Sequence, residues 1–172
     1  MKVPVNNSIR LSEHFTLGEV CKTNHKTKDG NMPPHAAIVN LTNLCENWLE
    51  DLRYSTNVLY GGALRQAQGP QRQGPLRVNQ PIIITSGYRS PEVNALVGGS
   101  PTSNHVTGCA VDIRCEDIVQ ALRYANILLD IADGTKRDFD ELFIERNKQG
   151  RYWIHFAVRP KENRRKINFL QT

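Results

Sequence analysis

Two histidines and an aspartate, His105, Asp112 and His155, are the residues of this sequence best suited to bind a metal through nitrogen and oxygen. A glycine turn at Gly108 would let the chain fold His105 back toward Asp112, and the small side chain of Ala110 leaves room above the strand between them. Three such ligands leave a fourth coordination position for water, which is the pattern of a catalytic zinc site. Taken alone, a histidine and a later aspartate are a weak signal, and a structural role for both stays open.

The pattern of apolar residues predicts the strands and helices that would position these residues. Runs of β-branched or alternating apolar residues predict four strands, over residues 81–85, 109–114, 139–145 and 152–158. Apolar residues at steps of three and four predict amphipathic helices over about 35–54 and 118–129. In the last strand His155 alternates with Ile154 and Phe156, so its side chain would face the opposite side of the sheet from theirs. Because helices and strands do not strictly alternate, we expect an α+β fold with a mainly antiparallel sheet and flanking helices.

Three sequence motifs occur in the same order as in a known peptidase family, namely Ser-Gly-Tyr-Arg-Ser at 86–90, Ser-x-His-x-x-Gly-x-Ala-x-Asp at 103–112 and Trp-x-His at 153–155. The chain thereby resembles the zinc D-Ala-D-Ala carboxypeptidase family of murein peptidases, and most of all the branch found in phage endolysins and at the C-terminus of longer wall enzymes. The resemblance implies that His105, Asp112 and His155 bind zinc. It also implies the hedgehog/D-Ala-D-Ala metallopeptidase-like fold, which lysostaphin-type peptidases share.

Arg89 and Ser103 are the candidate substrate-binding residues. Arg89 lies in a tight turn after a buried strand, so its guanidinium would face the metal and suit a substrate carboxylate or the oxyanion of a tetrahedral intermediate. A surface salt bridge is the alternative for this residue. The resemblance places Ser103 where family members hydrogen-bond the substrate, although a serine just before His105 would be equally suited to forming a turn.

The general base is the point at which the sequence departs from the family it resembles. Many members carry an acidic residue three positions before the last histidine, where this sequence has Tyr152. A phenol with a pKa of about 10 is a poor base at neutral pH. Glu145 is the nearest carboxylate and is in phase along its strand with Phe143 and Glu141, so we assign it as the catalytic base, with a solvated strand-end glutamate as the alternative.

The composition is that of a single globular domain with two basic segments. The chain has 172 residues, of which 39% are hydrophobic and 23% charged, and its formal net charge is +5. This length suffices for one peptidase domain over residues 1–172 with its own core. We expect a flexible insertion at about 61–80, where Gln-Gly-Pro recurs, and a basic tail at 159–172. Neither segment interleaves aromatic residues with its charges, which argues against a specific nucleic-acid partner.

The cysteines and three of the five histidines are expected to have ordinary roles. The apolar runs and the N-terminus indicate where the protein works. The four cysteines form no Cys-x-x-Cys pair, so we expect free thiols, with Cys45 in the core. His14, His25 and His35 lack partners at metal-binding spacing and are expected to be ordinary histidines. No apolar run is long enough for membrane insertion, and the N-terminus lacks a secretory signal. We therefore expect synthesis in the cytoplasm and action at the cell wall or in the periplasm.

The function expected from the resemblance is zinc-dependent hydrolysis of peptidoglycan stem peptides, of the D-Ala-D-Ala carboxypeptidase or the L-Ala-D-Glu endopeptidase type. The implied cofactor is Zn²⁺ and the implied partner is the peptide substrate. We expect a monomer, used in the manner of a phage or prophage endolysin. The alternative, which Tyr152 permits, is a zinc-stabilised cell-wall-binding module with weak or no catalysis.

Overall fold

The structure is a computed structural model that describes residues 3–60 and 80–171, so the insertion expected at 61–80 lies outside the described residues except for Gln80. The helical elements are α1 (Leu17–Val20), α2 (His35–Leu44), a π-helical segment (Cys45–Leu49), α3 (Glu50–Tyr60), α5 (Pro91–Leu96), a 3₁₀ helix (Asn104–Thr107) and α6 (Ile118–Thr135). The strands are β1 (Ile84–Ser86), β2 (Ala110–Cys115), β3 (Glu141–Arg146), β4 (Tyr152–Ala157) and β5 (Lys166–Gln171).

The five strands form one sheet in the order β1-β2-β4-β3-β5. The pairs β1–β2, β2–β4 and β3–β4 are antiparallel, whereas β5 is parallel to β3. After β4 the chain passes the first residue of β3 and then turns back, so β5 runs antiparallel to β4 and therefore parallel to β3. The predicted α+β fold with a mainly antiparallel sheet and flanking helices is confirmed.

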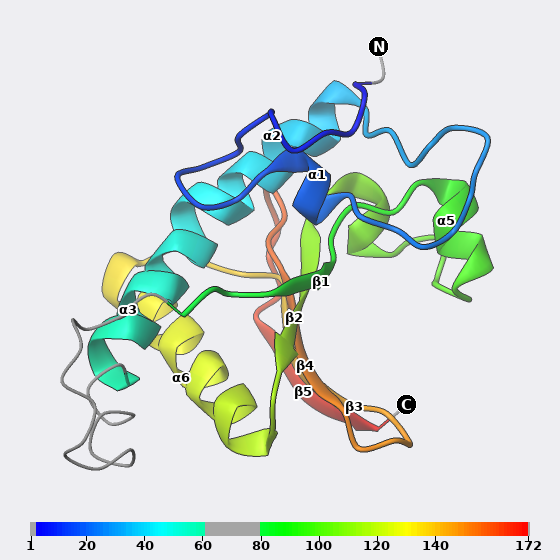
Figure 1. Cartoon of the computed structure of the whole chain (residues 1–172). Helices are drawn as coiled ribbons and strands as arrows, with labels where there is room; N and C mark the ends of the chain where they lie inside the picture. The colour runs from blue at the N-terminus through cyan, green and yellow to red at the C-terminus, as the bar shows by residue number, and fades with distance from the viewer. Residues whose placement is uncertain (1–2, 61–79, 172) are drawn as a thin grey trace, which may run out of the picture.

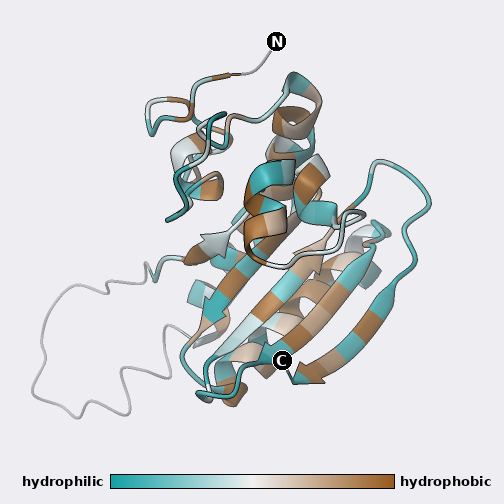
Figure 2. Cartoon of the chain, turned by 90° about the vertical axis from the view of Figure 1, so that its right-hand side faces the viewer, coloured by the Kyte–Doolittle hydropathy of each residue, from teal (hydrophilic) through white to brown (hydrophobic). Residues whose placement is uncertain are grey.

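Helices α2, α3 and α6 cover one face of the sheet, on the left in Figure 1, and the main core lies between these two layers. Trp48 lies near the centre of this core, with its ring centroid 5.1 Å from that of Phe156 and 6.4 Å from that of Phe139. Aromatic pairs at such distances each stabilise a fold by about 0.5–1.5 kcal/mol beyond the burial of their area. Figure 2 turns the opposite face toward the viewer, where α5 covers only one end of the sheet. We call this the open face.

Alternation along the strands places the metal-binding candidates on the open face. Ile154 and Phe156 of β4 are fully buried in the core, so His155 between them points the other way, as the sequence predicts. Asp112 likewise precedes the fully buried Ile113 in β2. Asp112 and His155 are paired directly across the β2–β4 ladder, which brings their side chains together.

Two predicted elements have different bounds in the structure. The helix expected over about 35–54 continues through the π-helical segment and α3 to Tyr60. The strand expected at 81–85 is reduced to β1, whose pairing with β2 is irregular between Ile84 and Ser86. The run of isoleucines before β1 still contributes to the core, because Ile82 is buried even though it lies outside the ladder.

All four cysteines are free and buried, as expected, and Cys45 belongs to the core. Among the described residues, no helix has both the length and the apolar character that a membrane crossing requires.

Within the segment expected to be a basic tail, residues 166–171 form the edge strand β5. The arginines that precede β5 form ion pairs with acids near the sheet. Arg164 binds Asp140 at 2.6 Å, and Arg165 binds both Asp133 and Asp138. These arginines therefore hold the C-terminal segment beside β3 through ion pairs with Asp133, Asp138 and Asp140.

Gly108 connects the 3₁₀ helix that carries His105 to β2. Its φ is +72°, and a Cβ placed there would lie 2.5 Å from the carbonyl oxygen of Ala37. We expect Gly108→Ala to lower the free energy of unfolding by about 1–3 kcal/mol, because a side chain is strained in this conformation and collides with α2. Urea unfolding of the zinc-free protein measures the change.

Gly134, near the end of α6, offers a matched control for this substitution. Its position has no atom within 4 Å of an added Cβ and lacks a positive φ. Gly134→Ala should therefore be neutral or stabilise the protein by about 0.5–1 kcal/mol, since alanine favours the helix. Equal stability of the two variants would contradict the role given to Gly108.

Candidate metal centre

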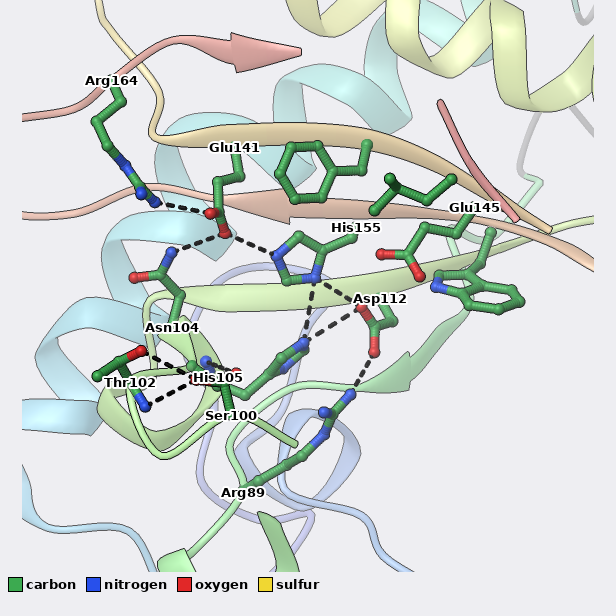
Figure 3. A pocket seen from close by; sticks show the side chains of 14 residues that line it. Arg89, Ser100, Thr102, Asn104, His105, Asp112, Glu141, Glu145, His155 and Arg164 are labelled. Carbon is green, nitrogen blue, oxygen red and sulfur yellow. Dashed lines mark hydrogen bonds and ion pairs between the residues drawn. The ribbon is translucent and has the colours of Figure 1, made fainter. Parts of the chain in front are cut away.

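His105, Asp112 and His155 form a buried cluster on the open face (Figure 3), with side chains that the sequence predicts to meet. Nε2 of His105 lies 3.2 Å from Nδ1 of His155. Oδ1 of Asp112 lies 3.0 Å from Nδ1 of His155 and 3.2 Å from Nε2 of His105. The three potential ligand atoms thus form a nearly equilateral triangle.

A second contact on each imidazole determines which nitrogen faces the cluster. Nδ1 of His105 lies 2.6 Å from the carbonyl oxygen of Gly87, which can only accept, so Nδ1 donates and Nε2 presents a lone pair. Nε2 of His155 lies 3.3 Å from the carboxylate of Glu141. In a neutral His155, Nε2 donates to this carboxylate, so Nδ1 turns its lone pair toward the cluster. Both tautomers are assigned from these hydrogen bonds.

The cluster fits a zinc ion. A tetrahedral zinc with ligand bonds of about 2.0–2.2 Å would separate its ligand atoms by about 3.3–3.6 Å, and the triangle here has sides of 3.0–3.2 Å. Two imidazole nitrogens and a carboxylate oxygen lie within 4.8 Å of one another, so all three could bind the same cation. Two histidines and one aspartate are also a donor set that zinc prefers when a fourth position stays open.

The electrostatics of the cluster favour positive charge at its centre. Burial alone would lower the pKa of His155, but Asp112 and Glu141 raise it to about 9. Burial alone would raise the pKa of Asp112, but the imidazoles of His105 and His155 hold it well below its usual range. In both cases the carboxylate–imidazole attraction outweighs the cost of burial.

Arg89 contacts the cluster through Asp112. Its Nη2 donates to Oδ2 of Asp112 at 2.6 Å, and its Nε donates to Oγ of Ser86 at 2.8 Å. This ion pair is mostly buried, since the Arg89 side chain is 20% exposed, and it leaves Oδ1 of Asp112 facing the two histidines. The Nη1 group has no hydrogen-bond partner among residues 3–60 and 80–171, and Arg89 lines the cavity over the cluster.

Ser103 begins the 3₁₀ helix that carries His105. Its Oγ accepts a hydrogen bond from the backbone N–H of His105 at 3.3 Å, which is the turn-forming role that the sequence left open. Ser103 also lines the cavity over the cluster, so a contact with substrate stays a prediction.

Glu145 and Tyr152 point to different sides of the sheet. Glu145 lines the cavity, and Figure 3 shows its carboxylate beside Asp112 and His155. In the described part of the chain it has no hydrogen bond or ion pair, and burial followed by the charge of Asp112 raises its pKa. Tyr152 packs against the core, with the guanidinium of Arg146 5.6 Å from its ring centroid. Position 152 therefore does not serve the cluster.

Two further residues of the cavity, Glu141 and Arg164, were not predicted to contact the site. The cavity has a volume of about 600 Å³ and includes both side chains. Glu141 binds His155, and Arg164 donates to Glu141 at 2.7 Å. The signal for Glu141 was its strand phase with Glu145, whereas Arg164 lies in the segment that was expected to be a tail.

The other three histidines, His14, His25 and His35, lie outside the cluster. Nδ1 of His14 pairs with Glu50 at 2.7 Å. Within the described residues, neither His14 nor His25 nor His35 belongs to a group that could hold a metal ion.

Glu141 orients a candidate ligand, so its removal should weaken metal binding. We expect Glu141→Ala to reduce the zinc affinity about 10- to 100-fold, because His155 loses the acceptor that holds its ring and tautomer. Glu141→Gln, which keeps an acceptor but loses the charge, should reduce the affinity less. Competition with a chromophoric chelator measures both affinities. Unchanged affinity in Glu141→Ala would contradict this role.

Comparison with known proteins identifies the family of the chain. The sequence model of the Peptidase M15 family matches residues 13–134, which is more than half of the 172 residues. The match includes Arg89, His105 and Asp112, whereas Glu145 and His155 lie beyond its end and reach the site through β3 and β4. A search of curated proteins finds no match. On the family match, and in agreement with a cluster suited to zinc, the chain belongs to the Peptidase M15 family of zinc-dependent peptidases.

Proposed function

We propose that the protein is a zinc-dependent peptidase that hydrolyses peptidoglycan stem peptides. The observation that carries this proposal is the convergence of His105, Asp112 and His155 on one point of a cavity that also holds the unpaired carboxylate of Glu145. Family membership supports peptidase chemistry, and the donor set supports zinc. The likeness of the motifs around Arg89, His105 and His155 to those of murein peptidases supports the stem-peptide substrate.

Each residue of the cavity has a role in this proposal. His105, Asp112 and His155 would hold a zinc ion, which when bound would polarise the scissile carbonyl and lower the pKa of water. Glu145 accepts a proton from the attacking water and delivers it to the leaving amine. Arg89 uses its free Nη1 group to bind substrate carboxylate or the negative charge that develops on the carbonyl oxygen.

Ser103 contributes a hydroxyl at the cavity wall, in reach of a bound peptide. These roles suit both a D-Ala-D-Ala carboxypeptidase and an L-Ala-D-Glu endopeptidase. Because the substrate is a wall polymer, we propose that the protein acts at the cell wall or in the periplasm.

Digestion of purified sacculi and of defined stem peptides with the zinc-loaded protein tests the proposal. Mass spectrometry of the products is expected to show new termini at one stem-peptide bond, and the termini identify which bond is cut. Stoichiometric zinc without any cleavage would contradict peptidase function and favour a zinc-stabilised cell-wall-binding module. Cleavage of unrelated peptides at a comparable rate would contradict the substrate class.

A further inference from the structure

A second cavity, of about 570 Å³, lies next to the metal cavity and shares Trp153 with it. It is formed where β2 ends and β4 begins, beside the turn that joins β3 to β4. We call it the flanking cavity. Its charged lining residues are Arg114, Glu116 and Arg151, and none of the three belongs to the metal cluster.

The cations of the metal cavity are already paired with acids. Arg89 binds Asp112 at 2.6 Å, and Arg164 binds Glu141 at 2.7 Å. Glu145 adds a further carboxylate to the same cavity. With three acids against two arginines, the lining of the metal cavity has a negative formal charge, although Arg89 keeps its Nη1 group for the substrate.

The flanking cavity has the opposite balance. Arg114 and Arg151 are exposed, and in the described part of the chain neither forms an ion pair. Glu116 is the acid in its lining, so the formal charge of the lining is positive. A guanidinium presents parallel N–H donors that match the two oxygens of a carboxylate. The flanking cavity is therefore suited to a carboxylate.

The strand register gives the distance between this cavity and the metal centre. Arg114 pairs with Trp153 across the β2–β4 ladder, and Asp112 pairs with His155, two residues along. Two residues of a strand span about 6.6–6.8 Å. An extended peptide covers about 3.3–3.6 Å per residue. A substrate group bound at Arg114 would thus lie about two residues from a bond held at the metal centre.

We propose that the flanking cavity is a subsite for a carboxylate of an acidic peptide, bound by Arg114 and Arg151 about two residues from the cleaved bond. Trp153 lines both cavities, so the bound peptide would pass along its side chain from one cavity to the other. The proposal rests on the proposed peptidase function for the identity of the bond, but the carboxylate subsite can be tested by binding alone.

Two forms of a defined stem peptide test this subsite, one with a free side-chain carboxylate and one with that carboxylate amidated, and both keep the free C-terminal carboxylate that Arg89 could bind. Calorimetry on the metal-free full chain measures binding, and kcat/KM of the zinc-loaded chain measures cleavage. We expect the acidic form to bind about tenfold more tightly than the amidated form, as charged hydrogen bonds of this kind allow. Arg114→Gln combined with Arg151→Gln should remove this preference.

Lys148 provides the matched control, because it is an exposed cation in the same turn that lines neither cavity. Lys148→Gln should keep the preference for the acidic form. The subsite is overturned if the double variant retains the preference, or if Lys148→Gln loses it equally. Carboxylate-dependent binding without cleavage would support the subsite while contradicting the peptidase function. Cleavage with equal rates for both peptide forms would do the reverse.

Discussion

Replacing His155 by alanine is expected to abolish stoichiometric zinc binding and, with it, hydrolysis of stem peptides. The variant would leave His105 and Asp112 to hold the ion, and two ligands do not complete the three-ligand set of a catalytic zinc site. Loss of an outer-shell partner costs about 10- to 100-fold in metal affinity, so loss of a ligand should exceed that range. Metal analysis after gel filtration gives the zinc content per chain.

Unfolding measurements provide a readout of zinc binding that does not depend on activity. A free zinc concentration about a hundredfold above its Kd would stabilise the wild-type protein by about 2.7 kcal/mol. This stabilisation should disappear in His155→Ala. His35→Ala is the control, because His35 is exposed at the start of α2 and does not belong to the cluster. One zinc per chain in His155→Ala would remove His155 from the ligand set.

The part of the site that could be predicted depends on local rules. Asp112 and His155 each lie beside fully buried strand residues, so alternation alone assigns both to the open face. Gly108 adopts the left-handed conformation that a turn toward Asp112 requires. The ladder register that sets Asp112 opposite His155 is not visible in either segment, because it depends on how two distant strands pair.

The parts that could not be predicted depend on which charges meet. The sequence shows Arg89 at a strand end, but its partner Asp112 is determined by the irregular pairing of β1 with β2. Arg164 reaches Glu141 only because the chain crosses the end of β3 to form β5. The basic residues of that segment indicate a tail, because the sequence does not show which acids they pair with.

The two glutamates of β3 that face the cavity differ in their electrostatics. A hydrogen bond with His155 is the main cause that lowers the pKa of Glu141, and Asn104 and Arg164 add to it. Burial is the main cause that raises the pKa of Glu145, and the charge of Asp112 adds to it. A carboxylate with a raised pKa binds a proton more readily in its catalytic cycle, whereas one held by hydrogen bonds from His155 and Arg164 does not. The contrast supports the proposed role of Glu145 as the base.

Glu145→Gln is therefore expected to retain zinc and to lose about 10²- to 10⁴-fold in kcat, the range that general base catalysis contributes. Glutamine keeps the size of the side chain but does not accept a proton at neutral pH. Metal content and stem-peptide hydrolysis, measured on the same preparation, separate loss of the base from loss of the ion. A variant with full activity would remove Glu145 from this role.

The pH dependence and the stability of Glu145→Gln test the same assignment from its electrostatics. Because the base must be ionised, kcat/KM of the wild type should fall as the pH decreases through the pKa of Glu145, which burial raises from its ordinary value. When the pKa of a carboxyl group is higher in the folded than in the unfolded protein, the free energy of unfolding decreases as the pH rises and the group ionises. Glu145→Gln removes that cost, so at pH 7 it should unfold at a urea concentration no lower than the wild type does. A variant that is less stable as well as less active would instead point to a structural role for Glu145.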